Sequence, residues 1–578
     1  MAEEEDISHP SIDPTFYDLI VVGTGLPESI IAAASSAAGK SVLHLDSNSF
    51  YGSHFSSLPL DDFASFLQSQ RNVSRTESPS SIAGAVAVSG DCISVDLKLR
   101  RLYSDIEICS HASPEVLAPS RKFSLDLSGP RVLFCADSTV DLMLKSGASH
   151  HIEFKSVDAS FVYSGDGRLS SVPDSRASIF KDRSLGLTEK NQLMRFFKLV
   201  QEHIGSAASF GDEKEKNGRI SEEDLESPFV EFLKKQRLPQ KIKSYRSHCP
   251  YLFVNQVSNL IILYAIAMAD YDQDNLEDCK NLLKTKDGIE SLALYHSSVG
   301  RFPNALGALI YPIYGQGEIP QAFCRCAAVK GALYVLRMPV TALLIDKGSR
   351  HYKGVRLASG QDLFSHQLIV DPSFIVPSPS VLPLPDLLQE SSESSSLREV
   401  KVKVARGVCI TRHSIKPDLS NLLVVFPPRS LYSEQVTSIR ALQLDSNLAV
   451  CPSGLFVLYL SALCDDTNQG KKLLHAAMDA LFTVSISENP ENSAAPVQSE
   501  GIEGEVKPSL LWSAMYIQEL ATDSSEAINS APMPDGNLNY MNLLDATVKM
   551  FHNMYPEEGF FVETMASENI EDDGGLSD

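Results

Sequence analysis

The feature that most constrains the fold is a strand–helix–strand unit at residues 17–46. Residues 17–22, Tyr-Asp-Leu-Ile-Val-Val, form a continuous apolar run of the kind found in buried parallel strands. A helix of small residues is expected at about 29–38, and a second strand at 41–45. A right-handed crossover places both strands parallel in one sheet, so the sequence predicts a Rossmann-like α/β sheet domain.

The loop after the first strand carries a damaged dinucleotide fingerprint. Such a loop uses three glycines, which make the turn, let the backbone approach a pyrophosphate and pack the helix on the strand. Gly23 and Gly25 supply the first two, but Glu28 stands where the third belongs. A carboxylate there would satisfy the helix N-terminus and repel a phosphate. Asp46, at the end of the second strand, is either a ribose ligand or a cap of the next loop, and the damaged loop favours the cap.

The remaining pattern predicts a sheet domain with a helical domain inserted in it. Residues 1–187 are expected to form the first part of the sheet domain, with a serine-rich, weakly patterned insertion at about 61–120. Apolar residues at helical spacing predict the helical domain over 188–300. Strand-like segments return over 301–563 as the second part of the sheet domain, and an acidic tail follows at 564–578.

Composition excludes several classes of function. The 578-residue chain has a formal net charge of −23 at pH 7, which repels a phosphate backbone and argues against nucleic-acid binding. Its 10 cysteines lack the spacing of a zinc site, so we expect no metal, and unpatterned thiols fit a reducing compartment. No signal peptide is expected at the start, and the longest apolar run, 260–269, is about half the length of a membrane span. These features predict a cytosolic protein.

Two separated blocks of sequence carry a resemblance to a known family. The first block is Tyr-Asp-Leu-Ile-Val-Val-Gly-Thr-Gly-Leu-Pro-Glu-Ser at 17–29, followed by Gly-Lys-Ser-Val-Leu-His-Leu-Asp at 39–46 and Phe-Tyr-Gly at 50–52. The second is Tyr-Pro-Ile-Tyr-Gly-Gln-Gly-Glu-Ile-Pro-Gln-Ala-Phe-Cys-Arg at 311–325. Together these blocks resemble the Rab GDP-dissociation inhibitors and Rab escort proteins. The resemblance implies an FAD-binding-type sheet domain that holds no flavin, and a smaller inserted α-helical domain.

The resemblance also implies a Rab-binding platform, which matches Tyr51, Glu318 and Arg325 of this sequence. These residue types suit a protein contact. An arginine forms forked hydrogen bonds, a glutamate accepts from a lysine or an amide, and a tyrosine is a rigid amphipathic contact enriched at interface hot spots. From the residues alone, a surface ion pair and a core tyrosine are the simpler interpretation.

In the family the helical domain receives the isoprenoid and the prenyltransferase. Candidate groove residues are Leu193, Phe196, Phe197, Ile261, Leu263 and Ile266, although ordinary helix packing is favoured for each one taken singly. Phe229 and Phe232 are candidates for the transferase contact. Residues 244–260 have no counterpart in the family pattern and form an unusual insert in this domain.

The predicted function is that of the escort branch of the family. Length favours it, because dissociation inhibitors are shorter and lack the segment at 61–120. Such a protein is an adaptor without a cofactor. It binds a new GDP-form Rab GTPase, presents it to the Rab geranylgeranyltransferase α/β heterodimer, shields the geranylgeranyl group and delivers the Rab through a transient membrane contact. The alternatives are a dissociation inhibitor that recycles prenylated Rabs and an FAD-dependent oxidoreductase.

Overall fold

A computed structural model describes most of the chain. The described residues are 11–72, 86–89, 91–165, 167–173, 187–208, 220–236, 260–276, 279–349, 351–375, 402–484, 507–520 and 528–561. Two predicted features lie outside them, namely the unusual insert up to residue 259 and the acidic tail at 564–578.

β1 (Phe16–Val22) lies inside the first of two large sheets, which we call sheet I. It pairs in parallel with β2 (Val42–Leu45) on one side and with β17 (Asp362–Val370) on the other. Because α1 (Leu26–Ala37) connects β1 to β2, the predicted strand–helix–strand unit is confirmed. The other strands of sheet I are β14 (Leu333–Val335), β25 (Asn529–Ser530), β16 (Tyr352–Leu357), β15 (Val340–Asp346), β5 (Cys92–Asp96) and β4 (Val86–Ser89).

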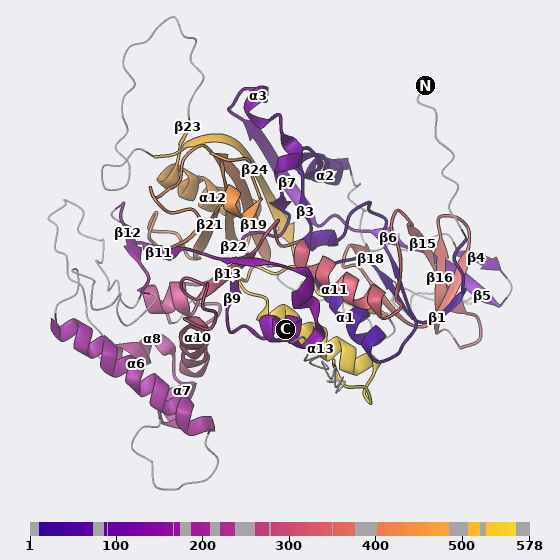
Figure 1. The fold of residues 1–578 in the computed structure, drawn as a ribbon, viewed down its shortest axis with the longest axis horizontal. Coiled ribbons are helices and arrows are strands. Elements are labelled where there is room, and N and C mark those ends of the chain that lie inside the picture. The colour runs from indigo at the N-terminus through magenta and orange to yellow at the C-terminus, as the bar shows by residue number, and fades with distance from the viewer. Residues whose placement is uncertain are drawn as a thin grey trace, which may run out of the picture.

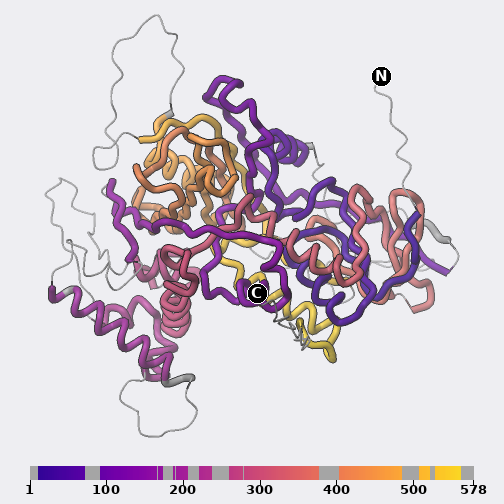
Figure 2. Tube along the Cα trace, viewed as in Figure 1, coloured from indigo at the N-terminus to yellow at the C-terminus, as the bar shows by residue number. Residues whose placement is uncertain are grey.

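Both faces of β1 are buried, which explains its uninterrupted apolar sequence. Leu19 and Val21 belong to a core shared with α1, α11 (Glu318–Val329) and α13 (Met541–Met554). Ile20 and Val22 belong to a separate core on the opposite face. The C-terminal helix α13, yellow in Figures 1 and 2, therefore returns to pack against the indigo N-terminal unit.

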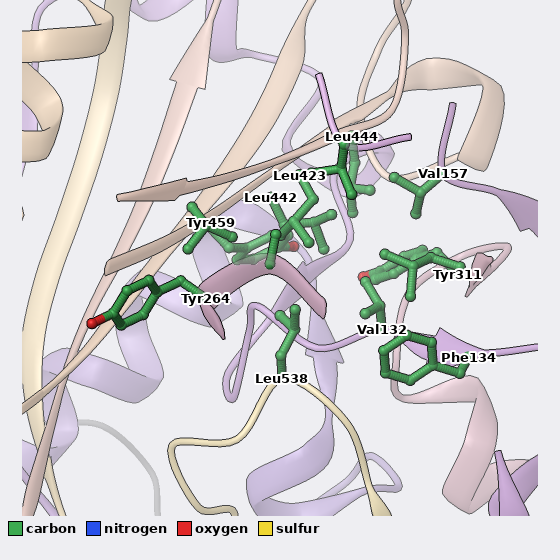
Figure 3. Packing of buried hydrophobic residues seen from close by; sticks show 14 of the residues in the cluster. Val132, Phe134, Val157, Tyr264, Tyr311, Leu423, Leu442, Leu444, Tyr459 and Leu538 are labelled. Atoms are coloured by element: carbon green, nitrogen blue, oxygen red, sulfur yellow. The ribbon is translucent and has the colours of Figure 1, made fainter. Parts of the chain in front are cut away.

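The second large sheet, sheet II, is mostly antiparallel. Its strands in spatial order are β12 (Leu169–Ser171), β11 (Ala159–Tyr163), β20 (Leu422–Phe426), β21 (Ile439–Asp445), β22 (Phe456–Cys464), β19 (Lys403–Thr411), β24 (Ser509–Glu519) and β23 (Thr483–Val484), with β7 (Tyr103–Ser110) beside β24. α12 (Thr467–Leu481) covers one face. On the other face Leu423, Leu442 and Tyr459 pack with Tyr311 of β13 (Leu309–Pro312) in the core of Figure 3.

Helices occupy the segment that was predicted to be helical, and they lie below sheet II in Figure 1. They are α6 (Leu187–Ala208), α7 (Glu222–Glu226), α8 (Phe229–Lys235), the π-helix η6 (Ile261–Ile266) and α10 (Thr285–Ser298). Arg440 of sheet II holds the chain after η6. Its Nη1 lies 2.7 Å from Oδ1 of Asp270, and its Nη2 donates to the carbonyl of Met268 at 2.6 Å. This buried guanidinium anchors the chain after η6 to sheet II.

The segment predicted to be an insertion at 61–120 supplies parts of both sheets where the structure describes it. α2 (Leu60–Asn72) buries Phe63 and Leu67 in the main core. β5 pairs with β15, and β7 pairs with β24, each antiparallel. The segment is therefore integral to the sheets rather than an excursion from them. β5 also pairs with its neighbour β4, but the partners that place the segment in the two sheets lie hundreds of residues further along the chain.

Two buried arginines join the sheets. Arg131 and Arg406 donate to the main-chain oxygen of Asp535 at 2.9 Å and 2.7 Å, and Asp535 lies between β25 and α13. In the described part of the chain, no helix is both long and apolar enough to cross a bilayer. The shorter elements include β3 (Ser57–Leu58), β6 (Lys98–Leu99), β8 (Leu125–Asp126), β9 (Leu133–Phe134), β10 (Phe154–Ser156), β18 (Phe374–Ile375), α3 (Pro114–Leu117), α4 (Ser138–Ser146) and η1 (Ser53–Phe55).

Candidate functional site

The glycine loop, residues 23–25, joins β1 to α1 at the position where a dinucleotide fold holds its pyrophosphate. Gly23 adopts a φ of 100°, in the left-handed region that glycine tolerates. Side chains cover both glycines. A β-carbon on Gly23 would lie 2.8 Å from Cβ of Asp371, and one on Gly25 would lie 2.5 Å from Oε2 of Glu28. The space directly above the loop is therefore filled by protein.

Glu28 is the group that fills it. Its side chain folds back over the first turn of α1 and is only 1% exposed. Burial raises the pKa of this carboxyl well above its usual value, and Asp371 and Asp46 raise it further. Among the described residues, Oε2 finds no hydrogen-bond partner. A pyrophosphate needs this same space and would meet three acidic side chains, so the residues present do not fit a dinucleotide such as FAD.

Asp46 is turned toward the protein on both carboxylate oxygens. Oδ2 accepts from the main-chain N–H and the hydroxyl of Thr24, at 2.9 Å and 2.6 Å, and from the hydroxyl of Ser53 at 3.2 Å. Oδ1 accepts from the main-chain N–H and the side-chain amide of Asn48, at 2.8 Å and 2.9 Å. These five contacts use the acceptor capacity of a carboxylate. Asp46 thus caps the loop that follows β2 and leaves no oxygen directed toward a ribose.

Tyr51 lies in that same loop and packs on an aromatic ring that in turn contacts a buried one. Its ring centroid is 6.1 Å from that of Tyr334 in β14, in an edge-to-face contact, and Tyr334 in turn lies 4.8 Å from His44 of β2. The Tyr51 side chain is partly exposed. Partial burial raises the pKa of its hydroxyl, and Cys324 and Asp46 add to the effect. One side of Tyr51 is therefore held by packing while part of it remains open to solvent.

Glu318 and Arg325 lie on α11, seven residues apart, so that two helical turns bring them to the same face. Glu318 is half-buried at the start of the helix. Its Oε1 accepts from Nε2 of Gln321 at 3.2 Å, and partial burial raises its pKa while Arg325 opposes that shift. Arg325 is exposed, and within the described ranges its guanidinium makes no hydrogen bond or ion pair. The helix thus presents, on one face, a partly desolvated carboxyl group and, two turns further on, an available cation.

A tight turn before α11 positions Glu318. Gly315 has a φ of 105°, and a β-carbon on Gly317 would lie only 2.7 Å from the main-chain nitrogen of Ser57. Asp126 binds this turn, because its Oδ1 accepts from the N–H of Gln316 at 3.0 Å and from the hydroxyl of Ser57 at 2.6 Å. Gly317 donates to the same hydroxyl at 2.8 Å. The turn is therefore fixed by buried hydrogen bonds rather than left free.

Asp126 is a residue whose role the sequence did not reveal. Its Oδ2 accepts a hydrogen bond from the hydroxyl of Tyr311, and its main-chain N–H donates to the hydroxyl of Tyr459 at 3.0 Å. Burial raises the pKa of Asp126 to about 6. The available signal was an isolated aspartate inside the apolar segment Ser-Leu-Asp-Leu at 124–127.

The candidate isoprenoid residues lie in the main core. Leu193, Phe196, Leu263 and Ile266 are buried, and Phe197 and Ile261 pack against the same cluster partly buried. Phe229 and Phe232 are 0% and 2% exposed, and the Phe229 ring packs against Gly288 of α10. These two rings fill the interior of the helical segment in this structure, and their contact with a transferase stays a prediction.

Cys324 and Cys326 are both buried on α11. The Cys324 thiol lies 3.2 Å from the hydroxyl of Ser29, and burial raises its pKa to about 12, which keeps it protonated and unreactive. In the ranges that the structure describes, no group of three or more histidine, cysteine, aspartate or glutamate side chains is arranged to hold a metal ion.

Comparison with known proteins identifies this architecture. A family model described as GDP dissociation inhibitor matches residues 12–81 and 87–490. Rab escort protein 1 of Arabidopsis thaliana is 55% identical over 98% of this chain and 98% of its own length. The Rab proteins geranylgeranyltransferase component A of Drosophila melanogaster is 27% identical over 97% of this chain and 93% of its own. The crystal structure of Rab GDI from Plasmodium falciparum has the same fold, with a TM-score of 0.61 at 18% identity, covering 94% of this chain and 99% of that one.

Proposed function

This chain belongs to the GDP dissociation inhibitor family, and on that premise we propose that it is a Rab escort protein, the substrate-binding accessory component of Rab geranylgeranyltransferase. The observation that carries the assignment is the 55% identity to an escort protein along nearly the whole of both chains. The alternative, a dissociation inhibitor that only recycles prenylated Rabs, has the weaker support of a shared fold at 18% identity.

The proposed contact with the Rab is the platform, which we define as Tyr51, Glu318 and Arg325. Arg325 is exposed and unpaired within the described chain, so its planar guanidinium can form two parallel hydrogen bonds to a carboxylate or to backbone carbonyls of the partner. Glu318, already partly desolvated, accepts from a lysine or an amide. Tyr51 supplies rigid aromatic area with few torsions to order on binding.

The chain works in this proposal as an adaptor and not as a catalyst. It binds a newly made, GDP-form Rab in the cytosol and presents the flexible cysteine-bearing tail to the transferase heterodimer, which performs the prenyl transfer. It then covers the geranylgeranyl group and delivers the Rab to a membrane. Removing an isoprenoid from water is favourable by about 0.8 kcal/mol per carbon, so a modest apolar groove in the helical domain suffices.

A flavin-dependent oxidoreductase is the rival from another class, since it shares the strand–helix–strand opening. The position of Glu28 argues against it. The Glu28 carboxyl fills the space above Gly25, and all acceptor sites of Asp46 are used by protein donors. Neither of the two ligand sites of a dinucleotide is therefore open in this chain.

Reconstituted prenylation tests the proposal. Unprenylated Rab loaded with GDP is mixed with the transferase heterodimer and geranylgeranyl diphosphate, with and without this chain, and lipid incorporation is measured. An escort protein makes prenylation depend on the added chain. A dissociation inhibitor leaves incorporation at its basal level but extracts prenylated Rab from membranes. The second pattern would replace the escort assignment with that of an inhibitor.

A further inference from the structure

Thr24, the residue between the two glycines of the loop, connects the glycine loop to the segment that carries Tyr51 of the platform. It is fully buried. Its main-chain N–H donates to Oδ2 of Asp46 at 2.9 Å and to the hydroxyl of Ser53 at 3.0 Å. Its hydroxyl donates to the same Asp46 oxygen at 2.6 Å. In a dinucleotide fold such loop amides face a phosphate, whereas here this one binds protein side chains.

Thr24 also receives hydrogen bonds from the residue next to Tyr51. The main-chain N–H of Gly52 donates to the hydroxyl of Thr24 at 2.9 Å and to its carbonyl at 3.1 Å. Gly52 is buried with a φ of 104°, and a β-carbon on it would lie 2.8 Å from Cα of Ser56. The chain on one side of Tyr51 is thus held at Gly52 and at Ser53, both of which contact Thr24.

The chain on the other side of Tyr51 is held as well. The N–H of Asp46 donates to the carbonyl of Val335 at 3.1 Å, and the N–H of Arg337 donates to the carbonyl of Asn48 at 3.1 Å. Between these anchors and Gly52, Tyr51 rests on the ring of Tyr334. The backbone on both sides of the tyrosine is fixed by hydrogen bonds, which are buried on the Gly52 side, and this limits the positions available to the tyrosine side chain.

We propose that the glycine loop, filled by Glu28 and closed to a phosphate, holds Tyr51 in the position in which it binds a Rab. Thr24 and Asp46 are the positioning residues. The proposal rests on the proposed function, because it takes Tyr51 as a Rab contact. An aromatic side chain that is held in its bound conformation loses less conformational freedom on binding. Thr24 and Asp46 can therefore raise the affinity for the Rab without contacting it. The retained Gly-Thr-Gly then serves the protein interface rather than a cofactor.

A purely structural role for Thr24 predicts something different. A buried threonine that only stabilises the fold would lower thermal stability when replaced, and its effect on Rab affinity would not depend on residue 51. A positioning residue loses its effect on binding once Tyr51 is absent. A double-mutant cycle between residues 24 and 51 separates the two roles.

The experiment measures the affinity of the full chain for a GDP-loaded Rab by fluorescence titration, with thermal unfolding beside it. Thr24→Val keeps the shape but removes the hydroxyl that bridges Asp46 and Gly52, and we expect about tenfold weaker binding. Thr24→Ser keeps the hydroxyl and should stay near the wild-type affinity. Thr547→Val is the matched control, because Thr547 is equally buried and donates to the carbonyl of Leu543 at 2.7 Å, in α13.

The decisive comparison is made in a Tyr51→Ala background. If Thr24→Val weakens binding in the wild-type chain but adds nothing to Tyr51→Ala, the result supports the positioning role of Thr24. An equal loss in both backgrounds overturns it and leaves the platform standing. If Tyr51→Ala alone has no effect, Tyr51 makes no Rab contact and the positioning proposal is wrong. If the wild-type chain does not bind Rab at all, the proposed function itself is overturned. Should Thr24→Val not fold, Ser53→Ala enters the same cycle, since Ser53 bridges Thr24 and Asp46.

Discussion

The carboxyl group of Glu28 lies directly over Gly25, with Oε2 at 2.5 Å from the point where a β-carbon of Gly25 would be. The second glycine of a dinucleotide loop is small so that a pyrophosphate can approach its backbone. In this chain the space left by the missing side chain is occupied by an acid from the first turn of the helix. One substitution in the fingerprint thus both fills and electrostatically closes the phosphate position.

The burial of Glu28 predicts a pH-dependent stability. Its folded-state pKa lies above that of an unfolded glutamate, so its favourable contribution is complete below the unfolded pKa and is lost as pH rises through the folded pKa. Glu28→Gln removes this titration. The difference in thermal midpoint, Glu28→Gln minus wild type, should therefore increase by about 2 °C or more between pH 5 and pH 8. Glu290→Gln, at an exposed position of α10, is the control, and an equal gain there would contradict the prediction.

The closed loop predicts that the purified protein carries no stoichiometric flavin in its visible absorption spectrum. Glu28→Gly should remain colourless as well, because Asp371 still covers Gly23 and the oxygens of Asp46 stay occupied. Flavin bound to the wild type would overturn the adaptor assignment. Flavin bound only to Glu28→Gly would show that Glu28 alone closes the site.

Arg325 predicts a loss of Rab affinity without a loss of fold. Arg325→Ala should weaken binding of a GDP-loaded Rab at least about tenfold, because a guanidinium at the centre of an interface is a frequent hot spot. Arg325→Lys should retain only part of the wild-type affinity, since an ammonium group cannot form the two parallel hydrogen bonds of a guanidinium. Arg412→Ala, at an exposed position just after β19, is the control. Unchanged affinity of Arg325→Ala would remove this residue from the platform.

The turn before α11 predicts that one added methyl group will disturb the platform. Gly317 has an ordinary φ of −59°, so an alanine there carries no backbone strain, but its β-carbon would lie 2.7 Å from the main-chain nitrogen of Ser57. The start of α11 must shift, and Glu318 with it. We expect Gly317→Ala to weaken Rab binding about tenfold and also to lower the thermal midpoint, because the atom that the β-carbon meets belongs to the main chain. Gly348→Ala places its β-carbon no closer than 3.5 Å to its nearest neighbour, and should bind normally.

In the helical segment the sequence pattern predicted the secondary structure but not the burial of individual side chains. The apolar spacing of Phe229 and Phe232 correctly indicated a helix, yet it did not say which side of that helix would be covered. In the structure both rings are buried, and Phe229 fits into the space left by Gly288 of α10. Local spacing is set by the geometry of one helix, whereas burial depends on neighbours that the chain brings in from elsewhere.

The sequence by itself determined the local elements and their chemistry. The apolar run of β1, the paired Gly23 and Gly25, and Glu28 in place of the third glycine follow from residue type and spacing, because these describe neighbours along one strand or one helix turn. Tertiary structure alone decided that Asp126 binds the turn before Glu318. It alone brought the hydroxyl of Thr24 to the N–H of Gly52. Those contacts join segments 28 to 190 residues apart, and only the packing of strands and helices into a common core selects which of many chemically suitable groups meet.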